Sequence, residues 1–297
     1  MQSLRRVGMD AARLTDEEIL YIENKIPEEV QPSLVARKLF PVEVLPHAGF
    51  MTVRGYKRTS MGQASISLYG QSKNKDRSVK TPYDVTVPVI EKKFSISWRD
   101  LEASRANGLP LDVQDALDAA RQCAEEEDKL LIIGQYTGWK ALGIEGLATA
   151  TGRNTQASGG AWPATSLTDL SNAIGKLEAS GHTNKSMYAC VLRSSWAAKL
   201  RALVSNTAKK WIEVIQGDEP LFPAGVYVSD SLFSSAGLST SALVLELGKE
   251  NFEMIIERDM SIYAKEDEDM NLQCKVYEVV TPRIKRATSI CEVTGLT

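Results

Sequence analysis

The ionisable side chains whose types could support catalysis or metal binding fall in two acidic runs and at two isolated histidines. Residues 125–128 (EEED) lie inside a long predicted helix, where four consecutive side chains fan through about 300° and cannot converge on one ion. Residues 266–269 (EDED) lack the spaced oxygen ligands and the glycine of a calcium-binding loop. We interpret both runs as solvated or interface-facing charge. His47 and His182 have no metal-ligand spacing, and we expect each to be an exposed or hydrogen-bonded loop residue.

Other signatures of enzymatic chemistry are missing from the sequence. It contains no G-x-S-x-G nucleophile motif, no phosphate-binding G-x-x-x-x-G-K-[ST] loop and no dinucleotide-binding G-x-G-x-x-G motif. The charged loop at residues 73–80 includes Asp76 and no interleaved aromatic residues, which favours an ordinary solvated loop over a phosphate-binding surface. We therefore predict no catalytic, cofactor-binding or metal-binding residues, and we expect that the protein is not an enzyme.

The four cysteines lie far apart in the sequence and form no C-x-x-C pair, which predicts buried or half-buried free thiols in a reducing compartment. They are Cys123, Cys190, Cys274 and Cys291.

The composition is that of an ordinary globular protein, with 43% hydrophobic and 25% charged residues in 297. A net charge of -3 argues against a protein that grips nucleic acid over a basic surface, although a container could still enclose it. No apolar run approaches the roughly 18 to 20 residues needed to cross a bilayer, and the N-terminal residues lack the apolar region of a signal peptide. We expect a soluble cytoplasmic product with no membrane partner.

Residues 111–134 give the strongest secondary-structure signal. Apolar side chains recur at i, i+3, i+4 and i+7, which gathers them on one face of an α-helix, and only Glu127 interrupts the stripe. Asp112 is a suitable N-cap, and Gly134 can end the helix in the left-handed conformation. This spine helix would be about 33 Å long, so we expect shorter elements to pack against it.

Residues 49–70 alternate in side-chain type on both sides of a turn-like segment at 59–62, which predicts the two strands of a long hairpin. This hairpin has too few large apolar residues to be stable alone, so we expect it to lie on another part of the protein or on another subunit. The predicted contacts with another subunit are made by Phe50, Val53, Tyr56, Ile66, Leu68 and Tyr69 of the hairpin, and by Leu39 and Phe40 of the preceding arm.

Helices and strands are mixed in the rest of the chain. Predicted helices cover residues 14–26, 166–180 and a segment that begins at Ser194. Predicted strands cover residues 85–90, 93–98, 187–192, 211–215, 226–229, 242–247, 252–257, 260–264, 272–280 and 284–293. This order predicts an α+β protein in which a compact α/β lobe interrupts a body of antiparallel strands.

Several stretches resemble the shell proteins that share the HK97-type fold, namely the major capsid proteins of tailed viruses and the encapsulins. The resemblance covers roughly half of the chain. Its stretches are LTDEEILYIENKI and VARKLFPVE in the arm, VPVIEKKFSISWRDLEASRANGLPLD, AARQCAEEEDKLLIIGQYTGWKALGIEGLA through the spine helix, and NFEMIIERDMSIYAKEDED.

The resemblance implies an HK97-type α+β capsid fold and a division of the chain into four parts. It implies an N-terminal arm at residues 1–46 and an extended E-loop at 47–86. It also implies a P-domain that carries the spine helix, at 87–143 and 246–297, and an A-domain at 144–245. The family contributes no catalytic residue, because assembly is its function.

Two functions follow from the resemblance. The favoured interpretation is the major capsid protein of a tailed virus, assembled in the host cytoplasm from pentamers and hexamers around double-stranded DNA, with portal, scaffold or decoration proteins as further partners. The glycine-, serine-, threonine- and alanine-rich segment 149–164 and the mild acidity favour this interpretation. The alternative is an encapsulin, a cytoplasmic nanocompartment that encloses a cargo enzyme, because the LTDEE and EEEDKLLIIG segments resemble those proteins closely. A third interpretation, an α/β enzyme with a cleft in the A-domain, has no supporting set of residues.

Overall fold

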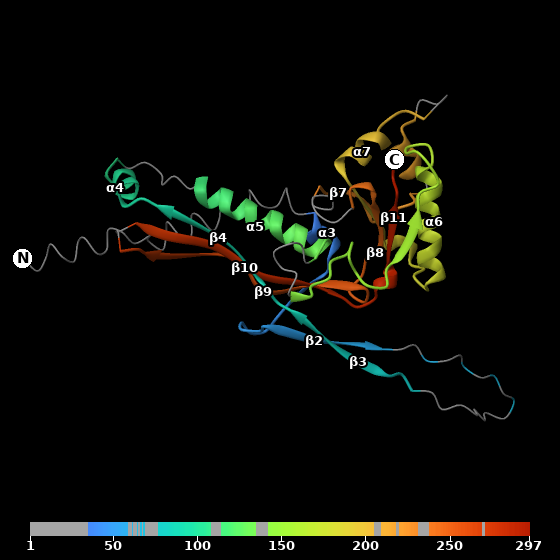
Figure 1. Ribbon diagram of the computed structural model, residues 1–297, viewed down its shortest axis with the longest axis horizontal. Helices are drawn as coiled ribbons and strands as arrows, with labels where there is room; N and C mark the ends of the chain where they lie inside the picture. The colour runs from blue at the N-terminus through green and yellow to red at the C-terminus, as the bar shows by residue number, and fades with distance from the viewer. Residues whose placement is uncertain are drawn as a thin grey trace, which may run out of the picture.

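The computed structural model arranges the chain as two β-sheets with covering helices and a separate two-stranded hairpin (Figure 1). This mixed architecture confirms the predicted α+β class. The predicted helix at residues 14–26 lies outside the described part of the chain. The structure describes residues 35–58, 61, 64, 66, 68, 77–107, 114–134, 142–204, 209–217, 220–230, 238–268 and 271–297.

The first sheet is an elongated platform with the strand order β1-β9-β10-β4. Its members are β1 (Val42–Val44), β9 (Phe252–Glu266), β10 (Leu272–Ile284) and β4 (Val89–Ile96). The long strands β9 and β10 pair antiparallel over nearly their full length. The two strands predicted at residues 252–257 and 260–264 are therefore one continuous strand.

The predicted spine helix is confirmed as α5 (Gln114–Ile132), which lies along the platform and contacts β10 and β4 (Figure 1). Its small residues allow close approach to the sheet, since Ala116, Ala120 and Ala124 are all buried. A second helix, α4 (Trp98–Asn107), follows β4 at the far end of the platform.

The C-terminal end of α5 is closed by a returning segment of chain. Leu147 and Ala148 donate backbone N–H groups to the carbonyls of Leu131 and Ile132, at 3.2 and 2.7 Å. These bonds satisfy carbonyls that would otherwise lack partners at a helix end. Gly134 has φ of 77°, and a Cβ atom there would lie 2.3 Å from the backbone nitrogen of Gly146. Glycine is therefore required at the predicted helix end, both for the left-handed conformation and for the close backbone approach.

The second sheet forms the core of a lobe at one end of the platform and has the order β5-β11-β8-β6-β7. All five residues of β6 and of β8 are buried. The strands are β5 (Asn154–Ala157), β6 (Tyr188–Leu192), β7 (Gly225–Val228), β8 (Ala242–Glu246) and β11 (Ile290–Thr294). The covering helices are α6 (Ser166–Ala179), α7 (Ser194–Leu200) and α8 (Trp211–Ile215). The predicted helices at 166–180 and from Ser194 are confirmed.

Two predictions about the lobe are wrong. Residues 211–215 form the helix α8 rather than a strand, because the Glu213 carboxylate accepts a 3.0 Å hydrogen bond from the Lys210 backbone N–H and caps the turn. The strand predicted at 284–293 is split: Ile284 ends β10, and β11 lies in the lobe between β5 and β8. The last strand therefore belongs to the lobe sheet and not to the spine-bearing body.

The four cysteines are buried and unpaired, as predicted. Burial is the main cause that raises each thiol pKa, to about 12 for Cys123 and about 11 for Cys274 and Cys291. These thiols stay protonated at neutral pH and behave as small hydrophobic side chains.

The packing of α5 leads to a direct test. We expect Ala120→Asp to destabilise the subunit by about 3–5 kcal/mol, because Ala120 is fully buried and the new carboxylate would have no partner there. The matched control is Gln122→Asp, two residues along the same helix on its exposed face, with an expected change within about 0.5 kcal/mol. Calorimetric melting of both variants checks this, and equal melting temperatures would show that the face is not buried.

Candidate subunit-contact surface

The hairpin is built from β2 (Thr52–Arg58) and β3 (Lys80–Thr86), which pair antiparallel from Thr52↔Thr86 to Arg58↔Lys80. The predicted hairpin is real, but its predicted second strand at residues 64–69 is wrong. The described residues Ala64, Ile66 and Leu68 lie outside any strand. Alternating residues define a strand only where a partner supplies hydrogen bonds, and here the partner of β2 comes later in the sequence.

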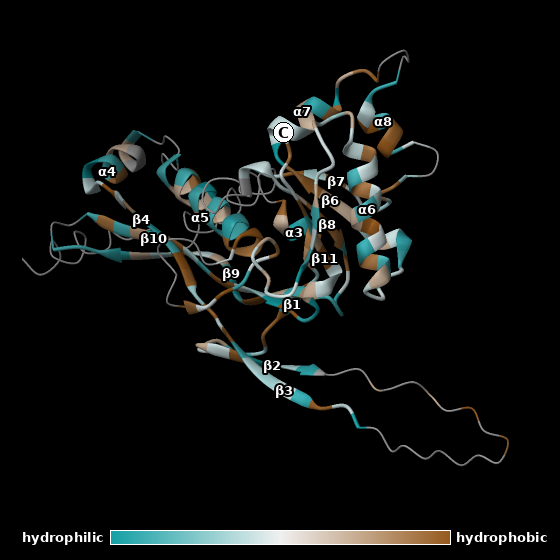
Figure 2. Cartoon of the chain, turned by 45° about the vertical axis from the view of Figure 1, so that its right-hand side comes forward, coloured by the Kyte–Doolittle hydropathy of each residue, from teal (hydrophilic) through white to brown (hydrophobic). Residues whose placement is uncertain are grey.

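The hairpin of β2 and β3 extends away from both sheets (Figures 1 and 2). Met51 is 83% exposed and Tyr56 is 61% exposed, while Ile66 and Leu68 are almost completely exposed. Within the described residues, β2 and β3 pair only with each other, so each strand has an unpaired edge. Exposed apolar residues beside open strand edges are typical of a surface that another chain covers.

The predicted contact residues divide into three groups. Phe50, Tyr56, Ile66 and Leu68 are exposed, and Val53 is half-buried. Tyr69 lies outside the described residues. Leu39 and Phe40 are 1% and 3% exposed and pack inside the subunit, so their prediction as intersubunit contacts is wrong. The reason is an internal partner, since the Phe40 ring meets the Phe252 ring edge to face with 5.1 Å between centroids.

Hydrogen bonds fix the root of the hairpin to the body. The Thr281 hydroxyl donates to the Thr86 carbonyl at 2.9 Å, and the Thr86 hydroxyl donates to the Leu142 carbonyl at 3.1 Å. Just before β2, the Gly49 N–H donates to the Glu257 carboxylate at 2.6 Å. Both strands of the hairpin are therefore held at the point where they leave the platform.

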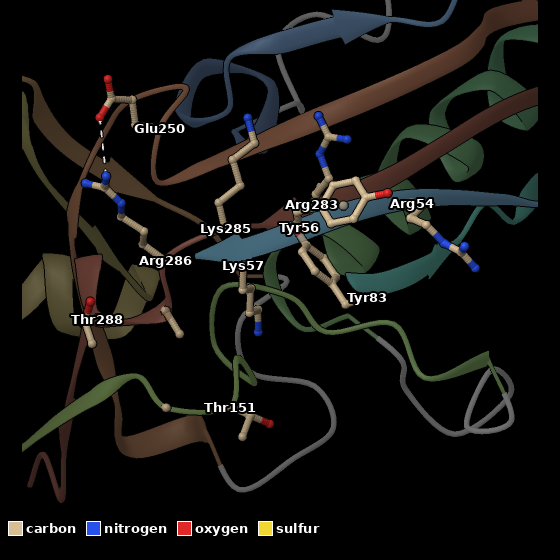
Figure 3. Close-up of a pocket in the computed structure, with 13 residues that line it drawn as sticks. Arg54, Tyr56, Lys57, Tyr83, Thr151, Glu250, Arg283, Lys285, Arg286 and Thr288 are labelled. Carbon is tan, nitrogen blue, oxygen red and sulfur yellow. Dashed lines mark ion pairs between the residues drawn. The ribbon is translucent and has the colours of Figure 1, made fainter. Parts of the chain in front are cut away.

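A cavity of about 680 Å³ lies between the hairpin and the end of β10, lined mostly by basic and polar side chains (Figure 3). The Tyr83 ring covers Gly55, where a Cβ atom would lie 2.6 Å from the ring, so the hairpin needs glycine at this position. Burial raises the pKa of Tyr83. Arg283 forms ion pairs with Glu43 and Glu253, and Lys285 pairs with Glu253 at 2.7 Å.

The helix α3 (Ala36–Leu39) is fixed to the body by a cluster of charged side chains around Arg37. The Arg37 guanidinium lies 2.8 Å from Glu127 of α5, 2.9 Å from Asp259 of β9 and 3.3 Å from Glu278 of β10. The side chains of Glu127 and Glu278 are completely buried. We refer to these four residues as the arm cluster.

The two buried carboxyls of the arm cluster share one guanidinium, and this makes full ionisation costly. Burial and the neighbouring Glu127 raise the pKa of Glu278 to about 9, and burial also raises the pKa of Glu127. Glu278 therefore holds its proton more tightly than an ordinary glutamic acid does. Asp259 is largely exposed, and the buried Cys123 thiol also faces Glu278.

Asp128, beside the arm cluster, fixes the start of α3. Its carboxylate accepts hydrogen bonds from the backbone N–H groups of Val35 and Ala36, at 3.1 and 2.7 Å, and from the Ser229 hydroxyl at 3.1 Å. A carboxylate at a helix N-terminus satisfies N–H groups that lack intrahelical partners. Asp128 therefore connects the arm, the spine helix and the lobe.

The interpretation of residues 125–128 as solvated or interface-facing charge is wrong for Glu127 and Asp128, which are buried, whereas Glu125 is exposed and Glu126 is half-buried. One signal in the sequence pointed to this outcome, since Glu127 interrupts an otherwise apolar helix face. A charged residue on a buried face normally has a partner, and Arg37 is that partner. His182 is hydrogen-bonded in the structure, as predicted.

In the described part of the chain, no group of three or more histidine, cysteine, aspartate or glutamate side chains has a geometry that could hold a metal ion. None of the helices described there is long and apolar enough to cross a membrane.

An extended hairpin, a long helix on an elongated sheet and a separate lobe define an HK97-type shell-forming protein. Solved structures agree on this fold. The virus-like particle from Pyrococcus furiosus matches with a TM-score of 0.69 at 16% identity, over 94% of this chain and 98% of that one. The capsid of Myoviridae phage XM1 matches with a TM-score of 0.67 at 13% identity, over 88% and 91%.

The sequence comparisons identify the family. The model described as "Encapsulating protein for peroxidase" matches residues 1–281, and the chain belongs to this encapsulin family. The type 1 encapsulin shell protein EncA of Myxococcus xanthus is 30% identical, over 95% of this chain and 94% of that protein. The diheme-cytochrome-encapsulin shell fusion protein of Kuenenia stuttgartiensis is 26% identical, over 91% and 70%. These relatives support the encapsulin alternative better than the viral capsid that was favoured from the sequence.

The arm cluster predicts a pH dependence of stability. The raised pKa of Glu278 means that the native state keeps a proton that the unfolded chain releases near its ordinary pKa of 4.5. The contribution of this proton to the free energy of unfolding is complete below pH 4.5 and is lost as the pH rises toward about 9. We expect the melting temperature to fall across this window, and Glu278→Gln to flatten the fall because it keeps a neutral hydrogen-bonding side chain.

The control variant is Glu91→Gln. Glu91 is partly exposed and its pKa is lowered by a 2.8 Å hydrogen bond from Lys275. The Glu91→Gln change should therefore leave the fall of the melting temperature with rising pH as it is in the wild type. A Glu278→Gln variant with the slope of the wild type would contradict the assignment of Glu278.

Proposed function

We propose that this protein is the subunit of an encapsulin shell, a cytoplasmic nanocompartment that assembles from copies of the chain and encloses a cargo enzyme. The observation that carries the proposal is the family match over residues 1–281, together with 30% identity to an encapsulin shell protein along nearly the whole of both chains. The family description names a peroxidase as the enclosed protein, so an enzyme of that kind is the first cargo to test. The role of the subunit is structural.

The four parts implied by the resemblance receive proposed roles from the architecture. The segment before residue 47 serves as the arm, the β2–β3 hairpin as the E-loop, α5 with the platform as the P-domain, and the lobe as the A-domain. The boundary at 246 needs one change, because β11 pairs with β5 and β8 and is best grouped with the A-domain.

The hairpin is the proposed contact between subunits. Its exposed apolar residues would be covered by a neighbour, and its open strand edges would accept further backbone hydrogen bonds. Because a hairpin from one subunit covers a different surface on the next, the contact is heterologous and repeats until rotation closes a shell. The hydrogen bonds at the root of the hairpin support this role, because they fix the direction of the hairpin within a single subunit.

Shortening the hairpin tests its role in assembly. Replacing residues 59–79 with an Asn-Gly turn keeps the β2–β3 register from Arg58↔Lys80 inward and favours a tight two-residue connection. We expect folded subunits with a nearly unchanged melting temperature that no longer form closed particles in electron microscopy. Normal particles from this variant would contradict the proposed contact.

Purification of the native particles tests the contents of the shell. We expect uniform closed particles with one co-purifying enzyme, identified by mass spectrometry, and an ultraviolet spectrum typical of protein. Expression of the chain alone should give empty particles of the same diameter. Native particles that contain long double-stranded DNA would instead support the viral capsid.

A further inference from the structure

Three side chains that the shell function does not use form a hydrogen-bonded relay in the lobe. His182 lies just after α6, Glu246 ends β8, and Thr288 lies in the short 3-10 turn Ala287–Ser289. The His182 Nδ1 atom is 2.5 Å from a Glu246 carboxylate oxygen, and its Nε2 atom is 3.0 Å from the Thr288 hydroxyl. His182 and Glu246 are buried, whereas Thr288 is exposed.

The surroundings of Glu246 determine which nitrogen of His182 carries the proton. The carboxylate also accepts hydrogen bonds from the Asn184 backbone N–H at 3.0 Å and the Asn251 side-chain amide at 3.2 Å. Since all of these groups donate to it, Glu246 acts as an acceptor and His182 Nδ1 donates. In the neutral imidazole Nε2 is then left to accept the proton of the Thr288 hydroxyl, which is the arrangement of a hydroxyl–imidazole–carboxylate triad.

Hydrogen bonds from neighbouring strands hold the backbone at both ends of the relay. The Asn154 side-chain amide donates to the Thr288 carbonyl at 2.7 Å, and the Tyr188 hydroxyl donates to the His182 carbonyl at 2.6 Å. The histidine and the threonine are therefore kept in register by strands and turns of the lobe. Such positioning is what a nucleophile and its base require.

Thr288 also lines the basic cavity beneath the hairpin (Figure 3). Lys57, Lys285 and Arg286 line the same cavity, and Arg286 is 57% exposed, with its guanidinium 3.7 Å from Glu250. This charge would attract small anionic molecules to the neighbourhood of the hydroxyl. The Thr288 hydroxyl is hydrogen-bonded to an imidazole and lies beside a positively charged cavity. This arrangement suits nucleophilic attack on an activated acyl compound that carries negative charge.

We propose that Thr288 is a nucleophile that becomes acylated by an activated acyl donor carrying phosphate, with His182 as the general base and Glu246 as the residue that positions it. The Thr288 Oγ atom forms a bond to the acyl carbon while its proton moves to His182 Nε2. The bond from the acyl carbon to its leaving group breaks, and the leaving group takes the electron pair and then the proton. The product is a threonine ester, and no oxidant or reductant is needed.

The cavity supplies an internal control for this proposal. Thr151 lines the same cavity and is also exposed, and its hydroxyl donates to the Glu145 carboxylate at 2.5 Å with no histidine in between. A hydroxyl that donates to an exposed carboxylate near the same basic side chains, as Thr151 does, should react slowly. A hydroxyl activated by an imidazole should react faster by about 10²-fold or more.

The experiment treats the assembled full-length protein with acetyl phosphate, and in parallel with the neutral ester 4-nitrophenyl acetate. Peptide mass spectrometry locates acetyl esters, which hydroxylamine removes, and separates them from stable lysine amides. We expect an ester at Thr288 that forms about 10²-fold faster than at Thr151, is retained in Thr288→Ser and is lost in Thr288→Val. Arg286→Ala should slow the reaction with acetyl phosphate more than that with the neutral ester.

The histidine is tested by His182→Gln, which should lower the Thr288 rate by about 10²-fold or more while leaving the Thr151 rate unchanged. Equal rates at Thr288 and Thr151 in the wild type would overturn the proposal and leave the relay as a contact that only holds the turn. An undiminished rate in a folded His182→Gln variant would overturn it as well. If that variant melts at a lower temperature, the wild-type ratio of the two threonine rates decides the question.

Discussion

One guanidinium between two buried carboxyls determines how the three main parts of the body meet. Arg37 contacts the spine helix through Glu127 and the platform through Glu278. Removing these groups from water is expensive, so the arrangement is stable only when the arm, the helix and the sheet are all in place. Because α3 leads directly into β1 and the hairpin root, this electrostatic requirement also sets the direction of the segment that leaves the body.

The hairpin shows the opposite balance of forces. It has hydrogen bonds at its root but little apolar burial along its length, so its outer part contributes little to the stability of a single subunit. A chain that keeps exposed apolar residues on a projecting hairpin gains from contact with another copy of itself. In the proposed shell, the body is formed within one chain and the hairpin is covered by a neighbouring subunit, and this division suits a family whose members form shells.

Prediction from the sequence succeeded where one side-chain period dominated. The spine helix and α6 each have a predominantly apolar face and recognisable ends, and both were predicted to within a few residues. It failed where the partner was distant, since β2 pairs with residues 80–86 and β11 pairs with β5 far earlier in the chain. Local alternation cannot choose a partner. The short helix α8 was mistaken for a strand because its five residues carry too little pattern to separate the two.

Glu127 and Asp128 illustrate a different limit of sequence reasoning. Glu127 interrupts the apolar face of α5 in the sequence, whereas nothing local marks Asp128 as buried, and the roles of both depend on Arg37 and on backbone N–H groups about 90 residues away. The relay of His182, Glu246 and Thr288 is similar, because its members are separated by 64 and 106 residues along the chain and no short motif marks them.

The place of β11 in the lobe sheet also constrains the order in which a newly made chain can fold. The strand β5 pairs only with β11 in that sheet, and residue 154 must wait for residue 291 to be synthesised. The spine helix can form earlier, because its contacts within the helix are local. A nascent subunit therefore keeps one edge of its lobe unfinished until almost all of these residues have left the ribosome, and it cannot offer a finished lobe to neighbouring copies before then.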